Sequence, residues 1–353
     1  MRGRRIAGSV VTPPPPRSAS MCRALTCLLM LFAVVSAASA EDLVLRNASY
    51  DPTREFYADY NRMFAAQWRQ RGGDAVEVAQ THGGSAAQAD AVISGEPTDV
   101  VTLALAADVD RIAAAGLLDA DWRHRMPHAG VPYTSTVVFL VRKGNPKHIT
   151  DWDDLAGDVA VVTADPKASG VARWSYLAAW TWASRAYRDG ARVLGYMRSL
   201  YANAPVMEDG ARGARDRFVG QGTGDVLLAW ENDALRVLAD PATSPAFEIV
   251  YPSISIRAEP AVAVVERNAD AHGVRALAEA YVANLYTPDA QRLVAQHHFR
   301  PMLRDGVPAS QLARFRNLPL VTVEAAFGGW DKAQATHFAE GGLYDQVRRA
   351  ATP

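Results

Sequence analysis

Residues 43–68 read LVLRNASYDPTREFYADYNRMFAAQW and predict a strand that passes directly into a helix. Leu43–Leu45 begins the strand as a short apolar run. Asp51 then suits a helix N-cap, and Pro52 suits the first helical position. Aromatic side chains recur every four residues and share one helix face, at Phe56, Tyr60, Phe64 and Trp68. The stretch therefore predicts a strand–helix unit with a buried aromatic face.

Alternation of strands and helices continues along the chain, whose 353 residues are 49% hydrophobic and 21% charged. Alternating elements predict parallel-type sheets with helices on both faces. The alternation restarts after one long apolar strand and returns through another, which fits two lobes joined by two crossover strands near 136–142 and 257–265. Further strands are expected at 75–79, 100–105, 136–142, 159–163, 206, 225–229, 247–250 and 261–266, and helices at 85–93, 108–114, 171–187, 274–286, 289–298 and 331–348.

The N-terminal 40 residues have the pattern of an exported protein. Residues 21–40 are typical of a secretion signal, with Arg23 as the charged end, an apolar run over 24–35, and the cleavage site Ala38-Ser39-Ala40. Residues 1–20 are a proline- and arginine-rich extension, unless Met21 is the true start. We expect residues 1–40 to be removed by cleavage after Ala40, which leaves 41–135 plus 262–353 as lobe one and 136–261 as lobe two.

Removal of this segment changes the charge and the cysteine content. Residues 1–40 hold five of the 37 basic residues and none of the 38 acidic ones, so the mature chain has 32 against 38 and a net charge of −6. This balance argues against binding to nucleic acid or to an anionic membrane. Both cysteines, Cys22 and Cys27, are also removed. The mature chain therefore has no disulfides and no thiol chemistry.

Short loops at four places each end a predicted strand region and open a predicted helix. They are SYDPTR (49–54), HGGS (82–85), KASGVAR (167–173) and DGARG (209–213). The first N–H groups of a helix lack partners and carry a partial positive charge. Several helix starts that converge make an anion site without lysine or arginine. Because ligands of open α/β sheets bind where strands end, the sequence predicts an extracytoplasmic receptor for a small oxyanion.

A set of longer strings resembles the periplasmic sulfate-binding proteins of sulfate/thiosulfate ABC importers. The resemblance extends from about residue 43 to 347. It implies a two-lobed periplasmic-binding-protein clamshell (type II), each lobe a mixed, mostly parallel sheet flanked by helices, with two crossover strands as the hinge. The strings are NASYDPTREFY (47–57), THGGSAAQA (81–89), VTLALAADV (101–109), PYTSTVVFLVRKGNPK (132–147), ARWSYLAAW (172–180), GARG (210–213), GDVLLAWEN (224–232) and FGGWDKAQATHF (327–338).

The resemblance also implies a site made only of hydrogen-bond donors. Ser85 would give both its N–H and its hydroxyl, and Trp230 its indole N–H; the others would give backbone N–H groups. The family usually has two glycines before ARW, so the β-branched Val171 could crowd the ligand. The donors so implied are Asp51, Ser85, Gly170, Val171, Ala211 and Trp230. Arg173, Arg212 and His82 are expected to brace these residues from behind, and Trp174, Trp180 and Trp182 to be core or lobe surface.

Other functions are weighed against this one. HGGS is similar to the oxyanion-hole string of esterases, with Ser85 as nucleophile, but the chain has no G-x-S-x-G elbow, so we expect no enzyme and no catalytic residue. A receptor of the same fold for ferric iron would favour paired tyrosines, and no Tyr-Tyr pair occurs. Molybdate differs from sulfate mainly in size and stays open, as does sulfate against thiosulfate.

The expected partners follow from the resemblance. The receptor would close over sulfate or thiosulfate in the periplasm and dock on an inner-membrane ABC permease driven by a cytoplasmic ATPase. We expect a monomer with no cofactor and no metal. Sulfate carries no proton near neutral pH, so a donor-only site would select it over phosphate, and a facing carboxylate would repel it.

Overall fold

The computed structural model describes residues 8–10, 12 and 43–351. The predicted signal segment and its cleavage site lie outside the described residues. Among the residues described, no helix has the length and apolar character needed to cross a membrane.

The first sheet has the strand order β2-β1-β3-β9. Its strands are β1 (Leu43–Tyr50), β2 (Val76–Gly83), β3 (Val100–Leu103) and β9 (Ala261–Val264). β1 pairs in parallel with β2 and β3, and β3 pairs antiparallel with β9. The carboxyl ends of β1 and β2 therefore meet at one edge of the sheet, where Tyr50 pairs with Gly83.

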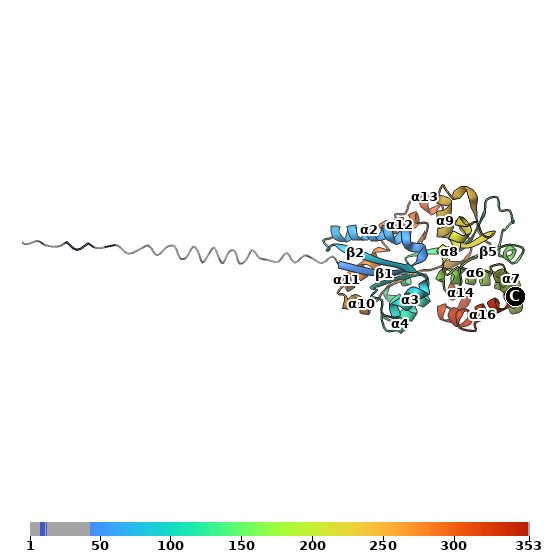
Figure 1. The fold of residues 1–353 in the computed structure, drawn as a ribbon, viewed down its shortest axis with the longest axis horizontal. Coiled ribbons are helices and arrows are strands. Elements are labelled where there is room, and N and C mark those ends of the chain that lie inside the picture. Colours follow the sequence, from blue (N-terminus) through green and yellow to red (C-terminus); the bar gives the residue numbers. More distant parts are fainter. Residues whose placement is uncertain (1–7, 11, 13–42, 352–353) are drawn as a thin grey trace, which may run out of the picture. The chain divides into compact units, whose positions relative to one another are not determined.

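Helices cover both faces of this sheet, as Figure 1 shows for α2 on one side and α3 with α4 on the other. The pleat explains the arrangement, because successive side chains point to opposite faces. Val100 joins the buried cluster that contains the aromatic face of α2, whereas Val101 joins the cluster under α3 and α4. The predicted aromatic face is confirmed: Phe56, Tyr60 and Phe64 are buried.

The second sheet follows the order β11-β8-β4-β6-β5, and β7 and β10 also pair with β4. Its strands are β4 (Tyr133–Arg142), β5 (Val161–Val162), β6 (Val226–Trp230), β7 (Phe247–Val250), β8 (Ser255–Ala258), β10 (Arg300–Pro301) and β11 (Leu320–Val321). Four of its six pairings are antiparallel and two are parallel. The expectation of a mostly parallel sheet is therefore wrong for this sheet, because the long central β4 runs against all its neighbours.

The helices connect and flank these strands. The α-helices are α2 (Arg54–Gln70), α3 (Ser85–Ile93), α4 (Ala106–Ala114), α5 (Trp122–Arg125), α6 (Gly170–Tyr187), α7 (Gly190–Ala202), α8 (Ala211–Arg215), α9 (Glu231–Ala239), α10 (Glu266–Ala271), α11 (Arg275–Asn284), α12 (Pro288–Gln296), α13 (Ala309–Leu312), α14 (Val323–Phe327), α15 (Trp330–Ala333) and α16 (Leu343–Ala351). Short 3₁₀ segments are η1 (Asp51–Thr53), η2 (Pro127–Gly130), η3 (Trp152–Ala156) and η5 (Ser244–Ala246), and η4 (Asp216–Gly220) and η6 (Gln334–Phe338) are π-helical turns.

The C-terminal segment associates with the second sheet rather than the first. β10 pairs with β4, β11 pairs with β8, and α16 packs against α7. The Tyr344 hydroxyl donates to Asp165 Oδ1 at 2.9 Å, and the rings of Trp330 and Trp174 meet edge to face at 4.8 Å. The expected lobe boundary, which put all of 262–353 in lobe one, thus differs from the strand pairing observed from residue 300 onward.

Four expected elements differ from those in the structure. The single long helix expected over 331–348 is interrupted after Phe338, where Ala339 is extended and Gly341 has a φ of 73°. Val206 forms no strand and is exposed. The expected crossover strand 136–142 also lies wholly within the second sheet, as part of β4. In the second expected crossover, 257–265, residues 257–258 end β8 and residues 261–264 form β9, so the crossing itself is the short link 259–260.

Candidate functional site

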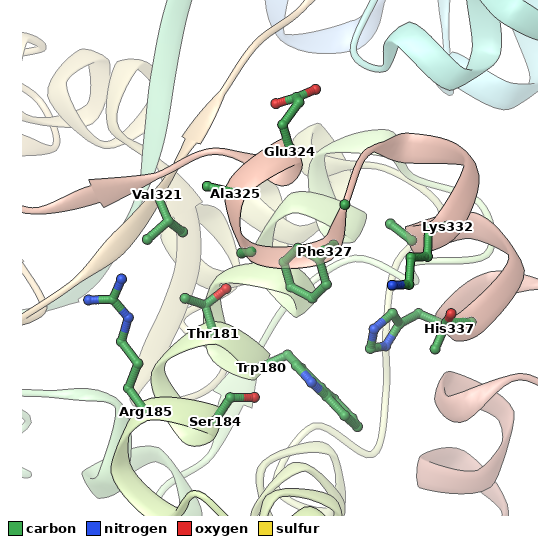
Figure 2. Close-up of a pocket in the computed structure, with 14 residues that line it drawn as sticks. Trp180, Thr181, Ser184, Arg185, Val321, Glu324, Ala325, Phe327, Lys332 and His337 are labelled. Carbon is green, nitrogen blue, oxygen red and sulfur yellow. The ribbon is translucent and has the colours of Figure 1, made fainter.

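The four predicted loops meet at one narrow pocket. It is lined by Tyr50, Asp51, Pro52, Gly83, Gly84, Ser85, Ala104, Ser169, Gly170, Val171, Gly210 and Ala211. Five of the six predicted ligand donors are therefore brought together, and the sixth, Trp230, lies outside this lining. A larger cavity of about 630 Å³ contains none of the six (Figure 2).

Helix starts supply the lining. α3 begins at Ser85, α6 at Gly170 and α8 at Ala211, each directly at the pocket. The first N–H groups of a helix have no partner within it and are the positive end of its dipole. The pocket thus faces several unpaired backbone donors and can hold an anion without a lysine or arginine side chain.

Asp51 lines the pocket, but it does not act as the predicted N-cap of a helix. The residue opens η1, and its side chain makes no capping bond to the helix backbone. Instead, Arg54 donates to Asp51 Oδ1 at 2.7 Å. The carboxylate is thus neutralised by a neighbour, which reduces its repulsion of an anion in the pocket.

Glycines allow the loops of the two sheets to approach closely. A side-chain carbon on Gly170 would lie 2.9 Å from Ala104 Cβ and 3.0 Å from Ser85 Cβ. One on Gly84 would lie 3.0 Å from a backbone oxygen of the facing loop, and one on Gly210 would lie 3.2 Å from Asp51 Oδ2. The lack of side chains therefore allows the loops of the first sheet to contact those of the second around the pocket.

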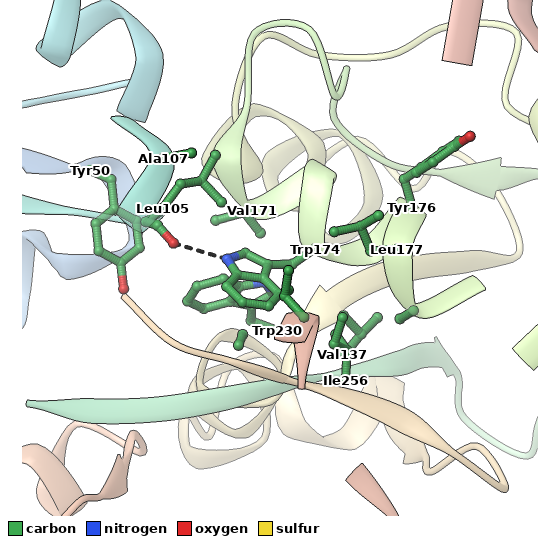
Figure 3. Close-up of a cluster of buried hydrophobic side chains, with 14 of the residues drawn as sticks. Tyr50, Leu105, Ala107, Val137, Val171, Trp174, Tyr176, Leu177, Trp230 and Ile256 are labelled. Atoms are coloured by element: carbon green, nitrogen blue, oxygen red, sulfur yellow. Dashed lines mark hydrogen bonds between the residues drawn. The ribbon is translucent and has the colours of Figure 1, made fainter. Parts of the chain in front are cut away.

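Trp230 ends β6 and is completely buried. Its ring meets that of Tyr50 edge to face, with centroids 5.8 Å apart (Figure 3). Its indole N–H has no hydrogen-bond partner among the described residues. By contrast, the nearby Trp174 donates its indole N–H to the Ala104 carbonyl at 2.9 Å, which confirms Trp174 as a core residue. Trp230 is therefore a buried donor with its bond unmade, next to a pocket residue.

The Ser85 hydroxyl has a partner that the sequence did not reveal. It donates to Asp108 Oδ2 at 2.6 Å and accepts from the Ala104 N–H at 3.1 Å. Asp108 is fully buried, and burial is the main cause that raises the pKa of its carboxyl. The hydrogen bond directs the single hydroxyl proton of Ser85 to Asp108 rather than into the pocket.

Ser169 is a pocket residue that the sequence reasoning did not select. It caps α6: its hydroxyl oxygen accepts from the Ala172 N–H at 3.3 Å. The hydroxyl proton has no acceptor among the described residues, and the residue lines the pocket. Its place directly before Gly170 could have indicated a ligand contact, but a serine at a helix start usually serves only as the cap.

Val171 lines the pocket and is 6% exposed. Its side chain belongs to the main buried cluster, beside Leu105 and Trp174 (Figure 3). The first N–H groups of a helix point along its axis and have no partner within it. The Val171 N–H therefore stays available to a ligand although the Val171 side chain is buried. The structure thus places the β-branched group in the core.

The three bracing residues occupy different settings. Arg173 is buried, donates to the Pro166 carbonyl at 2.8 Å, and burial lowers its pKa. Arg212 lies 3.5 Å from a carboxylate oxygen of Glu55, and the His82 ring contacts the Tyr50 carbonyl at 3.4 Å. Burial also lowers the pKa of His82. Arg173 and His82 thus hold loops that line the pocket, and Arg212 joins α8 to α2.

A metal is not indicated by the residue types. No cluster of three or more histidine, cysteine, aspartate or glutamate side chains suited to a metal ion occurs in the part of the chain that the structure describes. The pocket offers donors, whereas a metal ion needs lone-pair ligands.

Comparison with known proteins places the chain in a family. Residues 50–300 match the family described as bacterial extracellular solute-binding protein. The sulfate-binding protein of Escherichia coli K12 is 50% identical over 88% of this chain and 94% of its own. The thiosulfate-binding protein of Pseudomonas aeruginosa is 40% identical over 86% and 91%. The structure of the sulfate-binding protein SubI from Mycobacterium tuberculosis H37Rv superposes with a TM-score of 0.72 at 32% identity, over 83% of this chain and 98% of that one.

These findings confirm the resemblance, the two-sheet α/β clamshell class and the prediction that the chain is not an enzyme. The chain belongs to the bacterial extracellular solute-binding proteins of ABC importers, within the group of sulfate- and thiosulfate-binding proteins.

Proposed function

We propose that the narrow pocket binds sulfate or thiosulfate and that the chain delivers this anion to an ABC permease with a cytoplasmic ATPase. The names of the relatives support the ligand class. The many backbone donors of the pocket, together with the pairing of the Asp51 carboxylate to Arg54, agree with it, because an unprotonated dianion accepts hydrogen bonds and has none to donate.

The buried Trp230 indole N–H is the observation that carries this proposal. A buried donor without a partner costs about 1–3 kcal/mol. Trp230 lies in contact with Tyr50, which lines the pocket. A ligand oxygen would accept a hydrogen bond from the indole N–H, which removes this cost and adds a charge-assisted hydrogen bond.

The proposed donors come from both sheets. They are the N–H groups of Asp51, Ser85, Gly170, Val171 and Ala211, the Trp230 indole N–H and the Ser169 hydroxyl. The Ser169 hydroxyl replaces the Ser85 hydroxyl of the initial expectation, because Ser85 already donates to Asp108. A desolvated dianion is tolerated only when it is fully hydrogen-bonded, so each of these donors matters.

The anion would favour closure of two lobes. We assign lobe one to 43–131 and 261–299, and lobe two to 133–258 and 300–351, following the strand pairing. The chain segments that connect the two sheets would form the hinge. A ligand that contacts loops of both lobes binds the closed form more tightly and so shifts the population toward it.

The proposed location is the periplasm. The chain would act as a monomer in the periplasm after cleavage behind Ala40, without nucleic acid or membrane as partner. A permease could then recognise the closed form.

Isothermal titration calorimetry of the Trp230→Phe variant tests the assigned site. The change keeps the ring and removes one donor, so sulfate affinity should fall by about 10- to 150-fold, the value of a hydrogen bond to a charged group. Trp182→Phe is the matched control, since Trp182 packs against Tyr187 and Tyr196, does not line the pocket and should retain the parent affinity.

The parent protein is titrated with sulfate, thiosulfate, molybdate and phosphate in the same experiment. Binding of sulfate or thiosulfate without phosphate supports the function. Failure to bind either sulfur oxyanion would overturn it, whereas a Trp230→Phe variant with parent affinity would overturn only the site.

A further inference from the structure

A second cavity in the described part of the chain lies apart from the anion pocket. It has a volume of about 630 Å³ and lies between the C-terminal half of α6 and residues 321–337. This volume is in the range of sites for organic ligands, which are mostly apolar with a few placed polar groups. The string FGGWDKAQATHF (327–338) supplies much of its wall, although that string contributes no residue to the anion pocket.

Aromatic side chains form the centre of this cavity. The His337 ring lies 4.7 Å from the Trp180 ring and 5.4 Å from the Phe327 ring, both edge to face. Figure 2 shows Phe327 and Trp180 facing the open space between α6 and the segment that carries Lys332. Such faces favour a flat apolar body, which gains offset-stacked or edge contacts.

Positive charges flank the aromatic centre. Arg185 and Lys332 line the cavity, and neither forms an ion pair or hydrogen bond with any described residue. In the view of Figure 2 they lie on opposite sides of Phe327, and the Glu324 carboxylate points away from the ring cluster. The cavity therefore has two free cations and no acid directed at its centre.

His337 adds no third positive charge. It is buried, its Nδ1 lies 3.2 Å from the Tyr176 hydroxyl, and burial lowers its pKa to about 4. It belongs to η6, a π-helical turn. Turns of this type are rare and often occur at functional sites.

We propose that this cavity is a second ligand site that takes a flat aromatic molecule with a carboxylate or another anionic group. Inorganic sulfate does not suit it, because the cations do not converge with backbone N–H groups and the aromatic walls would stay unfilled. The aromatic body would contact Trp180, Phe327 and His337, and its anionic group would pair with Lys332 or Arg185.

Naphthalene-2-carboxylate and its uncharged amide form a matched pair of probes. Each is titrated into the purified protein with sulfate in excess, so that the anion pocket is occupied. We expect saturable binding of one carboxylate per chain, with the amide about two- to fivefold weaker, because one charge contact is lost.

Three variants locate the site. Lys332→Gln and Arg185→Gln should together weaken the carboxylate about tenfold, and Ala325→Trp should fill the opening and abolish binding. Arg198→Gln is the control, since Arg198 is exposed on α7 and does not line the cavity. All three should bind sulfate as the parent does, which also shows that they are folded.

Different results would contradict different parts of the proposal. No saturable binding of the carboxylate, or unchanged binding in Ala325→Trp, would overturn the second site. Equal binding of carboxylate and amide would overturn its anionic character. These results do not depend on whether the narrow pocket binds sulfate, because the probe is followed at a different cavity.

Discussion

The narrow pocket and the large aromatic cavity use opposite means to offer positive potential. In the narrow pocket, the donors are backbone N–H groups at the starts of α3, α6 and α8. In the cavity of about 630 Å³, the cations are the side chains of Arg185 and Lys332. α6 joins the two regions, with Gly170 at its start and Arg185 near its end.

The contrast teaches that cavity size does not identify the site of the main function. Backbone donors are fixed by the helices, so they are in place before the ligand arrives and cost little entropy to order. Exposed long side chains must be immobilised and are screened by salt. Substitutions should therefore affect anion binding far more at the pocket than at the cavity.

Apart from Trp230→Phe, the largest effect is expected from Gly170→Ala. The added carbon would lie 2.9 Å from Ala104 Cβ and 3.0 Å from Ser85 Cβ, so the facing loops must move apart. Overpacking of this kind costs about 1–3 kcal/mol, which corresponds to up to about 100-fold in sulfate affinity by calorimetry. Gly190→Ala is the control, because Gly190 also opens a helix but has nothing within 4 Å. Equal losses in both variants would contradict the close-approach argument.

The two pocket serines should separate in their effects. Ser169→Ala removes a donor to the anion and should lower sulfate affinity about tenfold. Ser85→Ala leaves Asp108 Oδ2 without its partner, so it should mainly reduce the free energy of unfolding, by about 1–3 kcal/mol. Calorimetry and urea denaturation measure the two quantities. Asp189→Ala, which removes the cap of α7, controls for loss of a helix cap. A larger affinity loss in Ser85→Ala would restore its hydroxyl as a ligand donor.

Asp108→Asn should act in the opposite direction. The substitution removes a buried negative charge that contacts the pocket residue Ser85. The amide oxygen of the new asparagine can still accept the hydrogen bond from Ser85. Sulfate should therefore bind about two- to fivefold more tightly at pH 7. Burial raises the pKa of the Asp108 carboxyl above its unfolded value of 3.8. Its contribution to stability is therefore complete below pH 3.8 and is lost as pH rises through the folded pKa.

Urea denaturation at several pH values measures this second effect. As pH rises above 3.8, the free energy of unfolding of the parent should fall relative to that of Asp108→Asn. The difference should become constant once the pH exceeds the folded pKa of the Asp108 carboxyl. A gap that is independent of pH would show that the carboxyl titrates alike in the folded and unfolded chains.

The smallest effect on sulfate is expected from His337→Gln, which changes the aromatic cavity. Burial lowers the pKa of His337 from 6.5 to about 4. The neutral ring therefore contributes stability that is present above pH 6.5 and is lost as pH falls toward 4. The variant should lose stability less steeply across this range in thermal unfolding, with sulfate affinity unchanged at pH 7. Identical slopes for parent and variant would argue against a buried neutral imidazole.

Much of the fold could be predicted because its signals are local. The helix 85–93 and the strand 247–250 are found as predicted, and the aromatic face of α2 is buried. The two-residue strands β10 and β11 were not predicted, since such short segments have no periodicity and are defined only by their pairing. Without them, the return of the chain to the second sheet could not be inferred.

The sequence by itself determined the family, the helix starts and the glycines that line the pocket, since these depend on neighbouring residues and on motifs. Only the tertiary structure decided which donors are free. The Ser85 hydroxyl donates its hydrogen bond to Asp108, 23 residues away, while the Trp230 indole N–H has no partner among the described residues. Hydrogen-bond partners are set by which elements fold against each other, and the spacing of residues along the chain does not contain that information.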